Sequence, residues 1–391
     1  MKLLIAGGGT GGHVFPAIAV AREWLRRGAE ESASEAHEEK GGHPSASLGV
    51  NSGRPLRALS EKREVVLVGT ERGLEMKLVP AAGLPLETIR VAGLKGMSGG
   101  KLLRNAAQVP LGMMDAAEIL KRHRVSVAFG VGGYASGPMM LMAVLKRVPT
   151  VILETNAEPG FANRRLARFV TRIATAHEVT AQAWGKKAVV TGCPVRAEFF
   201  EVRPKAHTAP FNILITGGSQ GALPINRAVV DALDLLAARK KELFLVHQSG
   251  ERDYNAVRVA YARREFKAEV LPFISNMPTR FAQADLIVCR SGAITVAEIA
   301  AAGRAAIFVP FAAATDSHQL RNAQVFERAG AAKIIPQPEL TPQRLAREIF
   351  SLLDQPEQIA EIETRVRAFA RPRAVEEIVD LIESVSDGKN L

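Results

Sequence analysis

The first residues that could do chemistry lie in a glycine-rich stretch near the start of the chain. Residues 7–17 read GGGTGGHVFPA, with five glycines and one threonine in the six positions before His13. Gly7, Gly9 and Gly12 match the pattern G-x-G-x-x-G, in which a strand ends, the chain turns and a helix begins. Free backbone N–H groups at such a helix start bind phosphate, and a nearby imidazole can take a proton from a hydroxyl group. We therefore predict an anion-binding turn with His13 as a general base; a tight structural turn with an ordinary histidine is the alternative.

Two further glycine turns follow other predicted strands. Residues 130–138 read GVGGYASGP, and residues 217–221 read GGSQG ahead of another helical pattern. Glycine lets the backbone approach a ligand closely, so three such turns favour a protein that holds phosphate groups from both sides of a cleft. A dinucleotide-binding protein is an alternative, because Glu71 follows the second strand where such proteins place an acidic residue.

Polar residues also follow the strands of the second half. Arg290 and Ser291 come directly after a predicted strand, and Glu298 lies one turn into the next helix. A carboxylate there can accept two hydrogen bonds from a ribose diol, although a glutamate near a helix start also suits the helix dipole. The next strand-to-helix junction carries Asp316, His318 and Gln319. Ligands of open α/β sheets bind at these carboxyl ends of strands, which predicts the second half of a site here.

The elements that must position these residues alternate along the whole chain. Short continuous apolar runs, typical of parallel strands buried on both faces, alternate with helical patterns. The predicted strands are 2–6, 65–69, 125–130, 150–154, 212–216, 243–248, 285–289 and 305–310. Repeated strand–helix units predict doubly wound parallel sheets. The pattern starts afresh near residue 213, which predicts two Rossmann-like domains that face each other across a cleft.

We expect the domain boundary near residue 195, in a linker rich in proline and charge. This gives an N-terminal domain at 1–194, a C-terminal domain at 195–371 and a last helix at 372–391 that could return to the N-terminal domain. Residues 29–64 are polar, rich in Ser, Glu and Gly, and without apolar periodicity. They predict a disordered insertion, with a functional lid as the alternative.

The composition is that of a globular protein with an anionic partner. The chain has 391 residues, of which 47% are hydrophobic and 23% charged, and a formal net charge of +11. This charge suits nucleic acid, acidic lipid or a phosphorylated substrate, but only 5% of the residues are aromatic, which argues against nucleic acid. No apolar run approaches the roughly 18 to 20 residues that span a bilayer and no signal peptide is recognisable, so we expect a cytoplasmic protein. Cys193 and Cys289 give neither a disulfide framework nor metal-ligand spacing.

Together the motifs resemble the MurG family, the UDP-N-acetylglucosamine–N-acetylmuramyl-(pentapeptide) pyrophosphoryl-undecaprenol N-acetylglucosamine transferases of bacterial cell-wall synthesis. Six motifs in the family's order carry the resemblance: GGTGGHVFPA (8–17), GVGGYASGP (130–138), GCPVR (192–196), GGSQGA (217–222), CRSGAITVAEIAAAG (289–303) and TDSHQLRNA (315–323). The resemblance implies a GT-B fold, in which two Rossmann-like domains hold the active site between them. It also implies inverting transfer of GlcNAc from UDP-GlcNAc to the C4 hydroxyl of the muramyl sugar of lipid I, which yields lipid II.

The same resemblance implies roles for individual residues. His13 would be the catalytic base. The UDP-GlcNAc site would comprise Thr10, Gly11, Gly12, Asn156, Arg196, Ser219, Ile274, Ala293, Ile294, Thr295, Val296, Ala297, Glu298 and Gln319. In this set Asn156 and Gln319 would hold the sugar, and Arg196 would lie near the diphosphate. The backbone of Ile274 would contact the uracil edge, and Glu298 would bind the ribose.

The acceptor implied by the resemblance carries a polyprenyl tail, so we expect a peripheral protein on the cytoplasmic face of the bacterial plasma membrane. Apolar residues beside cations at 94–114 predict a docking patch for an anionic membrane surface, although an amphipathic core helix shows the same pattern. The residues assigned to acceptor and membrane are Lys95, Lys101, Leu102, Leu103, Arg104, Tyr134 and Ser136. We expect no obligatory metal, with Mg²⁺ at most a stimulator, because glycine turns and arginine can offset the diphosphate charge.

Two positions depart from the family's pattern. The family commonly shows His-Glu-Gln-Asn where residues 153–156 read LETN, so Leu153 and Thr155 replace polar groups near the sugar site. Two other functions fit the same sequence. One is a GT-B transferase with another lipid or small-molecule acceptor, and the other is a non-catalytic nucleotide-sugar binder.

Overall fold

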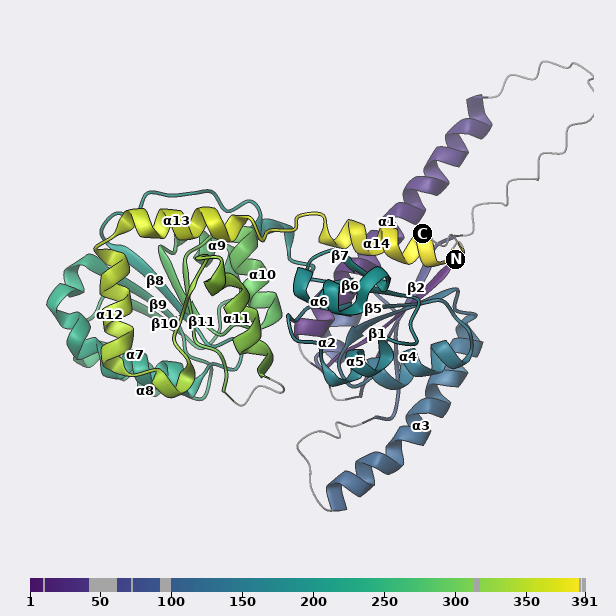
Figure 1. Ribbon diagram of the computed structural model, residues 1–391, viewed down its shortest axis with the longest axis horizontal. Coiled ribbons are helices and arrows are strands. Elements are labelled where there is room, and N and C mark those ends of the chain that lie inside the picture. Colours follow the sequence, from purple (N-terminus) through teal and green to yellow (C-terminus); the bar gives the residue numbers. More distant parts are fainter. Residues whose placement is uncertain are drawn as a thin grey trace, which may run out of the picture.

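The computed structural model describes residues 1–9, 11–41, 62–71, 73–91, 100–312, 317–386 and 388, and for 34–41 and 100–109 it describes the backbone alone. Within these residues the chain forms two parallel-sheet domains that lie side by side (Figure 1). The continuous apolar strands of the sequence predicted this architecture.

The N-terminal domain is built on a seven-stranded sheet in the order β3-β2-β1-β4-β5-β6-β7. Its strands are β1 (Lys2–Gly7), β2 (Glu64–Gly69), β3 (Leu86–Thr88), β4 (Val127–Gly132), β5 (Thr150–Glu154), β6 (Arg172–Thr175) and β7 (Ala188–Val190). Its helices are α1 (Gly11–Gly41), α2 (Glu75–Ala81), α3 (Gly100–His123), α4 (Ser136–Leu145), α5 (Phe161–Leu166) and α6 (Glu178–Trp184). The strand order reverses between β1 and β4, and ligands of such sheets bind where it reverses.

The C-terminal domain repeats this plan with six strands in the order β10-β9-β8-β11-β12-β13. Its strands are β8 (Phe211–Thr216), β9 (Leu243–Gln248), β10 (Ala268–Leu271), β11 (Leu286–Cys289), β12 (Ala306–Phe308) and β13 (Lys333–Ile334). Its helices are α7 (Leu223–Leu236), α8 (Tyr254–Arg263), α9 (Met277–Gln283), α10 (Ala293–Ala302), α11 (His318–Arg328), α12 (Pro342–Leu353) and α13 (Pro356–Arg367). The last helix, α14 (Ala374–Ser386), follows them.

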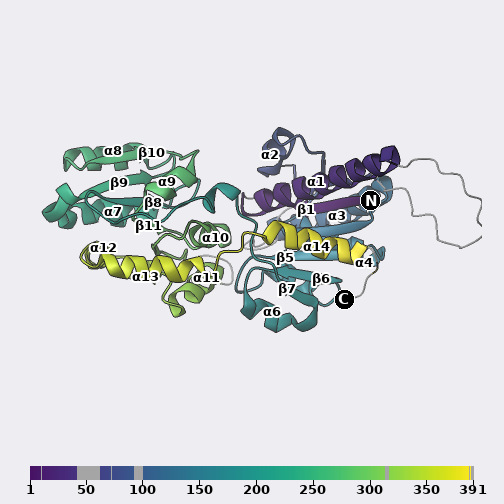
Figure 2. The ribbon, with the colours of Figure 1, turned by 90° about the horizontal axis from the view of Figure 1, so that it is seen from above.

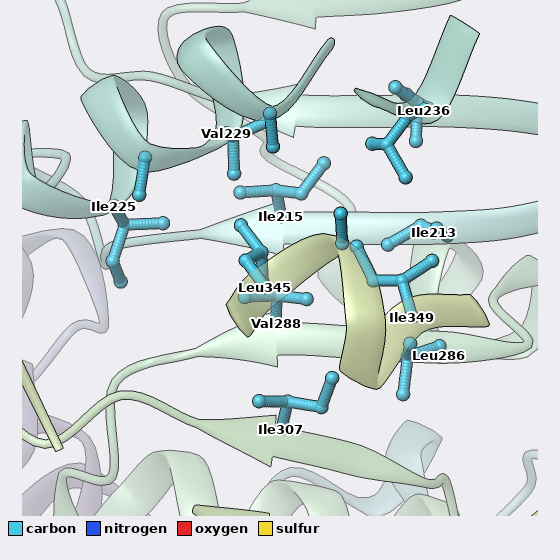
Figure 3. Packing of buried hydrophobic residues seen from close by; sticks show 14 of the residues in the cluster. Ile213, Ile215, Ile225, Val229, Leu236, Leu286, Val288, Ile307, Leu345 and Ile349 are labelled. Carbon is cyan, nitrogen blue, oxygen red and sulfur yellow. The ribbon is translucent and has the colours of Figure 1, made fainter. Parts of the chain in front are cut away.

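The apolar strands are buried on both faces. Ile213 and Ile215 of β8 lie in one cluster with Ile225 and Val229 of α7 (Figure 3), whereas Leu214 between them belongs to the cluster on the opposite face. Successive side chains of a strand point to opposite faces, so only a sheet covered by helices on both sides buries every residue of such a run.

The last helix belongs to the N-terminal domain in space, although it follows the C-terminal domain in sequence. Ile378 and Ile382 of α14 are buried in one core cluster with Leu3 of β1. Arg27 of α1 donates a hydrogen bond to Asp380 of α14 at 2.6 Å. Figure 2 shows α14 beside α1. The chain therefore crosses between the two domains twice, and both crossings lie beside the site described below.

The eight predicted strands are all present, with ends that differ by at most two residues. The prediction missed β3, β6, β7, β10 and β13, because each has only two to four residues and does not stand out as an apolar run.

The expectation of disorder from residue 29 was wrong for residues 29–41, which continue helix α1. Gly28 lies inside this helix, although glycine often marks the end of one. A Cβ there would come within 2.6 Å of the Arg63 side chain, so a glycine allows the close approach. Ala and Glu are good helix formers, and they prolong a helix that packing of its first turns has already nucleated. The rest of the predicted insertion, up to residue 61, lies outside the described residues.

None of the helices in the described ranges combines the length and apolar character that crossing a lipid bilayer requires.

Candidate active site between the two domains

Polar loops at the carboxyl ends of the two sheets meet between the domains. Figure 1 shows α10 and α11 on the side of the C-terminal domain that faces the N-terminal domain. Across from them, the loop after β5 carries Asn156, and the loop after β1 leads into His13. The site is therefore built from strand ends and helix starts of both halves, as the spacing of the motifs predicted.

The first glycine turn binds a carboxylate of its own chain. The Gly9 N–H donates a hydrogen bond of 2.7 Å to Oε2 of Glu75, at the start of α2. The other oxygen, Oε1, accepts from the Thr70 N–H and Oγ–H, both at 2.9 Å. The prediction of a free anion-binding turn is thus wrong for the Gly9 N–H, because Glu75 already occupies it. Gly11 and Gly12 form the first residues of α1, as expected, and Thr10 lies outside the described residues.

His13 lies in the first turn of α1 and is half-buried. Loss of water contact lowers the pKa of His13 below its usual value, against the opposing effects of a hydrogen bond to the Gly8 backbone and of the nearby carboxylates Glu154 and Glu75. Gly132 lies so close to the ring that a Cβ there would be 2.9 Å from Cδ2 and Nε2. The ring is therefore neutral at pH 7, which is the state that a general base requires.

The third glycine turn packs on the first. Gly132 and Gly133 have φ values of +96° and +82°, and a Cβ on Gly133 would lie 2.2 Å from the carbonyl oxygen of Gly8. Both positions therefore require glycine. Tyr134, in the same turn, is exposed. The expectation that Ser136 contacts the acceptor is wrong, because its side chain is 1% exposed and lies against Gly130.

Glu154, at the end of β5, organises the loop that carries Asn156. Its Oε1 accepts hydrogen bonds from the Asn156 N–H at 2.9 Å and from Asn156 Nδ2 at 3.0 Å. Its Oε2 accepts from the Gly160 N–H at 2.9 Å and from Asn163 Nδ2 at 3.0 Å. The sequence pattern gave no sign of a role for Glu154 or Asn163, because only the folded loop brings these donors around one carboxylate.

Asn322 of α11 joins this loop to the C-terminal domain. Its Oδ1 accepts from the Ala157 N–H at 2.9 Å, and its Nδ2 donates to Asn156 Oδ1 at 3.1 Å. His318 of the same helix forms a 2.8 Å hydrogen bond with the Glu158 carbonyl. Asn322 was missed as a single residue, although it stands in the motif TDSHQLRNA. These bonds place the predicted sugar-binding asparagine directly at the domain interface.

The two departures from the family pattern have different surroundings. Leu153 is buried in the core of the N-terminal domain, so it contributes apolar packing. Thr155 lines a small pocket between the domains together with His177, Ala293 and Arg371. A polar contact to a sugar at position 153 is therefore absent from this chain.

The second glycine turn, ahead of α7, leaves Ser219 exposed. Gly221 in this turn has a φ of +72°, and a Cβ there would lie 1.9 Å from the Ser249 carbonyl oxygen. Gln248 links the turn to the predicted uracil position, because it donates to the Gly218 carbonyl at 2.8 Å and accepts from the Ile274 N–H at 2.8 Å. The Ile274 N–H is thus already engaged by a side chain of the same domain.

The predicted nucleotide helix, α10, presents only part of its first turns to the interface. Ala293 and Ala297 line the pocket between the domains. Ile294 and Thr295 are half-buried. The side chain of Val296 is 2% exposed and belongs to the core of the C-terminal domain, and one edge of it lines the same pocket.

Glu298 lies on α10 close to an arginine of the interdomain crossing. Burial raises the pKa of Glu298 to about 7, although the Arg196 guanidinium, 3.9 Å away, acts in the opposite direction. Arg196 also lies over the Phe199 ring at 5.0 Å from its centroid. The carboxyl predicted to bind ribose therefore changes its charge close to neutral pH.

Gln319 is oriented from both sides. Its Oε1 accepts from the Phe311 N–H at 3.0 Å, and its carbonyl accepts from Ser291 Oγ at 2.8 Å. Arg290, beside Ser291, is buried and donates to the Val309 carbonyl at 2.9 Å. The strand-end residues found in the sequence are thus brought together around the start of α11.

Several predicted site residues cannot be placed. Asp316 and Lys95 lie outside the described residues, and Lys101, Leu102, Leu103 and Arg104 are described by their backbone alone, in helix α3. Among residues with described positions, no three His, Cys, Asp or Glu side chains gather as metal ligands would.

The contact between the two glycine turns gives a stability prediction. Gly133→Ala would press a Cβ onto the Gly8 carbonyl at a positive φ, so we expect it to lower the free energy of unfolding by roughly 2–4 kcal/mol. Gly137→Ala is the matched control, because a Cβ at this nearby position meets nothing within 4 Å, and we expect a change within about 1 kcal/mol. Urea unfolding of both variants measures the difference; equal stabilities would contradict the packing argument.

Comparisons with known proteins find matches to both domains. Residues 3–49 and 56–175 match the glycosyltransferase family 28 N-terminal domain, and residues 212–378 match the family 28 C-terminal domain. The chain is 40% identical to the UDP-N-acetylglucosamine–N-acetylmuramyl-(pentapeptide) pyrophosphoryl-undecaprenol N-acetylglucosamine transferase of Myxococcus xanthus, over 97% of this chain and 92% of that protein. It is 42% identical to the protein of the same name from Anaeromyxobacter sp., with the same coverage.

A solved structure shows the same likeness in three dimensions. The crystal structure of Acinetobacter baumannii MurG matches with a TM-score of 0.74 and 31% sequence identity, over 98% of this chain and 99% of that chain. Sequence identities of 31–42% thus extend over both domains and at least 97% of this chain. The fold is therefore GT-B, and the chain belongs to the family of UDP-N-acetylglucosamine–N-acetylmuramyl-(pentapeptide) pyrophosphoryl-undecaprenol N-acetylglucosamine transferases, the MurG family.

Proposed function

We propose that this chain transfers GlcNAc from UDP-GlcNAc to the C4 hydroxyl of the muramyl sugar of lipid I, with inversion at the anomeric carbon, and so forms lipid II for peptidoglycan synthesis. Relatives that carry this activity in their names are 38–42% identical over nearly the whole chain. The observation that carries the proposal is the hydrogen-bonded contact of Asn322 with Asn156 and Ala157. It brings the half that carries His13 against the half that carries Glu298 and Gln319.

In this mechanism the N-terminal domain supplies the base. The O–H bond of the acceptor hydroxyl breaks, and its proton moves to the unprotonated nitrogen of the neutral His13 ring. The oxygen's electron pair forms the new bond to the anomeric carbon. The bond from that carbon to the diphosphate oxygen breaks, and its electron pair leaves on UDP. Direct displacement at the face opposite the leaving group inverts the anomeric centre.

The C-terminal domain supplies the donor site and offsets the charge of the leaving group. The helix start after the Ser219 turn and the Arg196 guanidinium are the groups proposed to face the diphosphate. Glu298 would accept the ribose hydroxyls, and Asn156 with Gln319 would hold the sugar. With these groups in place the proposed reaction needs no obligatory metal, and Mg²⁺ would act only as a stimulator.

The direct test is transfer of labelled GlcNAc from UDP-GlcNAc to a lipid I analogue. We expect His13→Ala to lower kcat by about 10² or more, because removal of a general base typically costs this much, while UDP-GlcNAc still binds. His123→Ala is the control, since this histidine of α3 pairs with Glu87 at 2.8 Å and has no part in the proposed mechanism. Full activity of His13→Ala would remove the base from its role, and absence of transfer by the unaltered protein with UDP-GlcNAc bound would point to another acceptor.

The raised pKa of Glu298 predicts pH-dependent donor binding. The ionised carboxylate accepts hydrogen bonds from the ribose better than the protonated acid, and its pKa is about 7. We therefore expect the Kd for UDP-GlcNAc to rise as the pH falls from 8 to 6, by up to about tenfold. Calorimetry over this range measures it.

The matched variant for this measurement is Glu298→Gln. It keeps the shape of the side chain and removes the titrating group, so we expect weak binding at pH 8 and little change with pH. A pH dependence that persists in Glu298→Gln would assign the titration to another group.

We further propose that the protein acts at an anionic membrane surface, because the acceptor carries a polyprenyl chain. On α3, Leu111 and Met114 are 38% and 65% exposed, respectively. They follow Arg104 at seven and ten residues, which is a helical spacing, and so lie on one face of the apolar and cationic stretch that the sequence predicts at 94–114. Figure 1 shows α3 extending away from the sheet.

Charge reversal tests this surface. We expect Lys101→Glu combined with Arg104→Glu to weaken binding to phosphatidylglycerol vesicles by about tenfold or more, since each cation near an anionic bilayer contributes about 1 kcal/mol. UDP-GlcNAc binding should be unchanged. Lys240→Glu combined with Lys241→Glu is the control, because it alters the net charge equally in the C-terminal domain. Vesicle binding that is unchanged, or reduced equally in both variants, would exclude α3 as the docking element.

A further inference from the structure

Glu75 is an enclosed carboxylate that the proposed mechanism does not yet use. Its side chain lies at the start of α2 and is 1% exposed. Burial alone would raise the pKa of Glu75, but hydrogen bonds from the Gly9 N–H, the Thr70 N–H and the Thr70 hydroxyl outweigh it and leave the pKa below its usual value. Glu75 is therefore ionised at neutral pH, with backbone donors on both of its oxygens.

The chain around Glu75 is shaped to admit this carboxylate. A Cβ on Gly8 would lie 2.2 Å from Oε1, and a Cβ on Gly73 would lie 1.9 Å from Oε2. A Cβ on Gly69 would lie 2.5 Å from Cγ. Three glycines thus surround the Glu75 side chain: Gly8 after β1, Gly69 at the end of β2 and Gly73 in the loop that follows β2. A side chain at any of these positions would displace the carboxylate.

The turn that binds Glu75 also holds the ring of His13. The hydrogen bond between the ring and the Gly8 backbone raises the pKa of His13, so it stabilises the protonated ring, and the Gly8 group that accepts it is the carbonyl. Gly9, whose N–H binds Glu75, follows directly in the chain. The position of the Glu75 carboxylate and the orientation of the His13 ring are thus coupled through two residues of backbone.

We propose that Glu75 is a positioning residue for the base: it fixes the Gly8–Gly9 turn, so that the Gly8 carbonyl holds one nitrogen of the His13 ring and the other nitrogen faces the acceptor hydroxyl. This inference rests on the proposed role of His13. The Gly8 carbonyl then does for this histidine what a carboxylate does in a catalytic triad, which is to fix the tautomer and the direction of the ring.

Glu75 also contributes charge at the moment of reaction. The charged groups that act on His13 are Glu75 from α2 and Glu154 from the end of β5. Both carboxylates are nearly excluded from water, and both favour the imidazolium that forms when the ring accepts a proton. Because hydrogen-bond donors surround the Glu75 carboxylate, it stabilises this positive charge without taking the proton itself.

The test is Glu75→Gln in the full chain. An amide keeps the size of the side chain but sets an NH₂ group against the N–H of Gly9 or of Thr70, so one of the two backbone hydrogen bonds to this side chain is lost. We expect kcat for GlcNAc transfer to fall about 10- to 100-fold, with the KM for UDP-GlcNAc changed less than twofold, because the proposed donor contacts lie mainly in the other domain. The acidic limb of the pH profile should move to lower pH, since the loss of a negative charge makes the ring a weaker base.

Two further variants separate positioning from folding. Glu71→Gln removes a charge from the same segment at an exposed position, and we expect unaltered kinetics. Gly73→Ala keeps the charge of Glu75 but presses on its carboxylate, so we expect a fall in kcat in the same direction. If Glu75→Gln does not fold, Gly73→Ala carries the test, with thermal unfolding as its check.

The titration of the His13 ring, followed by NMR in the unliganded protein, is independent of catalysis. We expect the apparent pKa of the ring to be lower in Glu75→Gln than in the unaltered protein, and unchanged in Glu71→Gln. An unchanged His13 titration together with an unchanged kcat, or a loss of kcat that follows a loss of UDP-GlcNAc binding, would overturn the proposal. Activity that persists in His13→Ala would instead show that the base is another group, whatever the NMR result for Glu75.

Discussion

The candidate site depends on one buried side-chain amide, that of Asn322, which forms hydrogen bonds with residues of both domains. Asn322 is fully buried, and it hydrogen-bonds to Asn156 and Ala157 of the N-terminal domain and to the Ser291 carbonyl of its own domain. A buried polar group left without a partner costs about 1–3 kcal/mol, so separation of the loops is opposed unless water or a ligand replaces these bonds. The interface that satisfies Asn322 is the one that brings the two halves of the site together.

The two halves provide opposite electrostatic surroundings. On the N-terminal side, Glu75 and Glu154 are buried carboxylates whose oxygens accept backbone and side-chain hydrogen bonds around His13 and Asn156. Such surroundings suit a neutral hydroxyl and a base that becomes positive. On the C-terminal side, the Arg196 guanidinium and the positive dipole ends of α7 and α10 form the surroundings that the proposed mechanism assigns to a diphosphate gaining negative charge. A transferase needs both surroundings within one site, and two separate sheets allow them to be built independently.

The glycine turns show how one sequence pattern serves two purposes. All three turns stand at strand ends, as the sequence predicts, and the Ser219 side chain of the second turn is exposed. The other two pack on each other, with Gly133 against the Gly8 carbonyl and Gly132 against the His13 ring. The same glycine pattern recurs because each turn requires backbone without a Cβ, so that another group can approach it closely. The glycine pattern alone does not distinguish a turn that a ligand approaches from a turn that another part of the chain approaches.

The sequence by itself determined the features that rest on local physics. Continuous apolar runs predicted the longer strands, the restart of the strand–turn–helix pattern near residue 213 predicted the two domains, and motifs in a fixed order indicated the family. The sequence did not reveal five of the strands of two to four residues, because their stability comes from neighbouring strands. It also did not reveal that residues 29–41 are helical, because packing of the preceding turns decides this. Tertiary structure alone decided that Glu75 meets Gly9, 66 residues away, and that Asn322 meets Ala157, 165 residues away. It also buried Ser136 and raised the pKa of Glu298, since burial and charge at a residue depend on groups that only the folded chain brings near it.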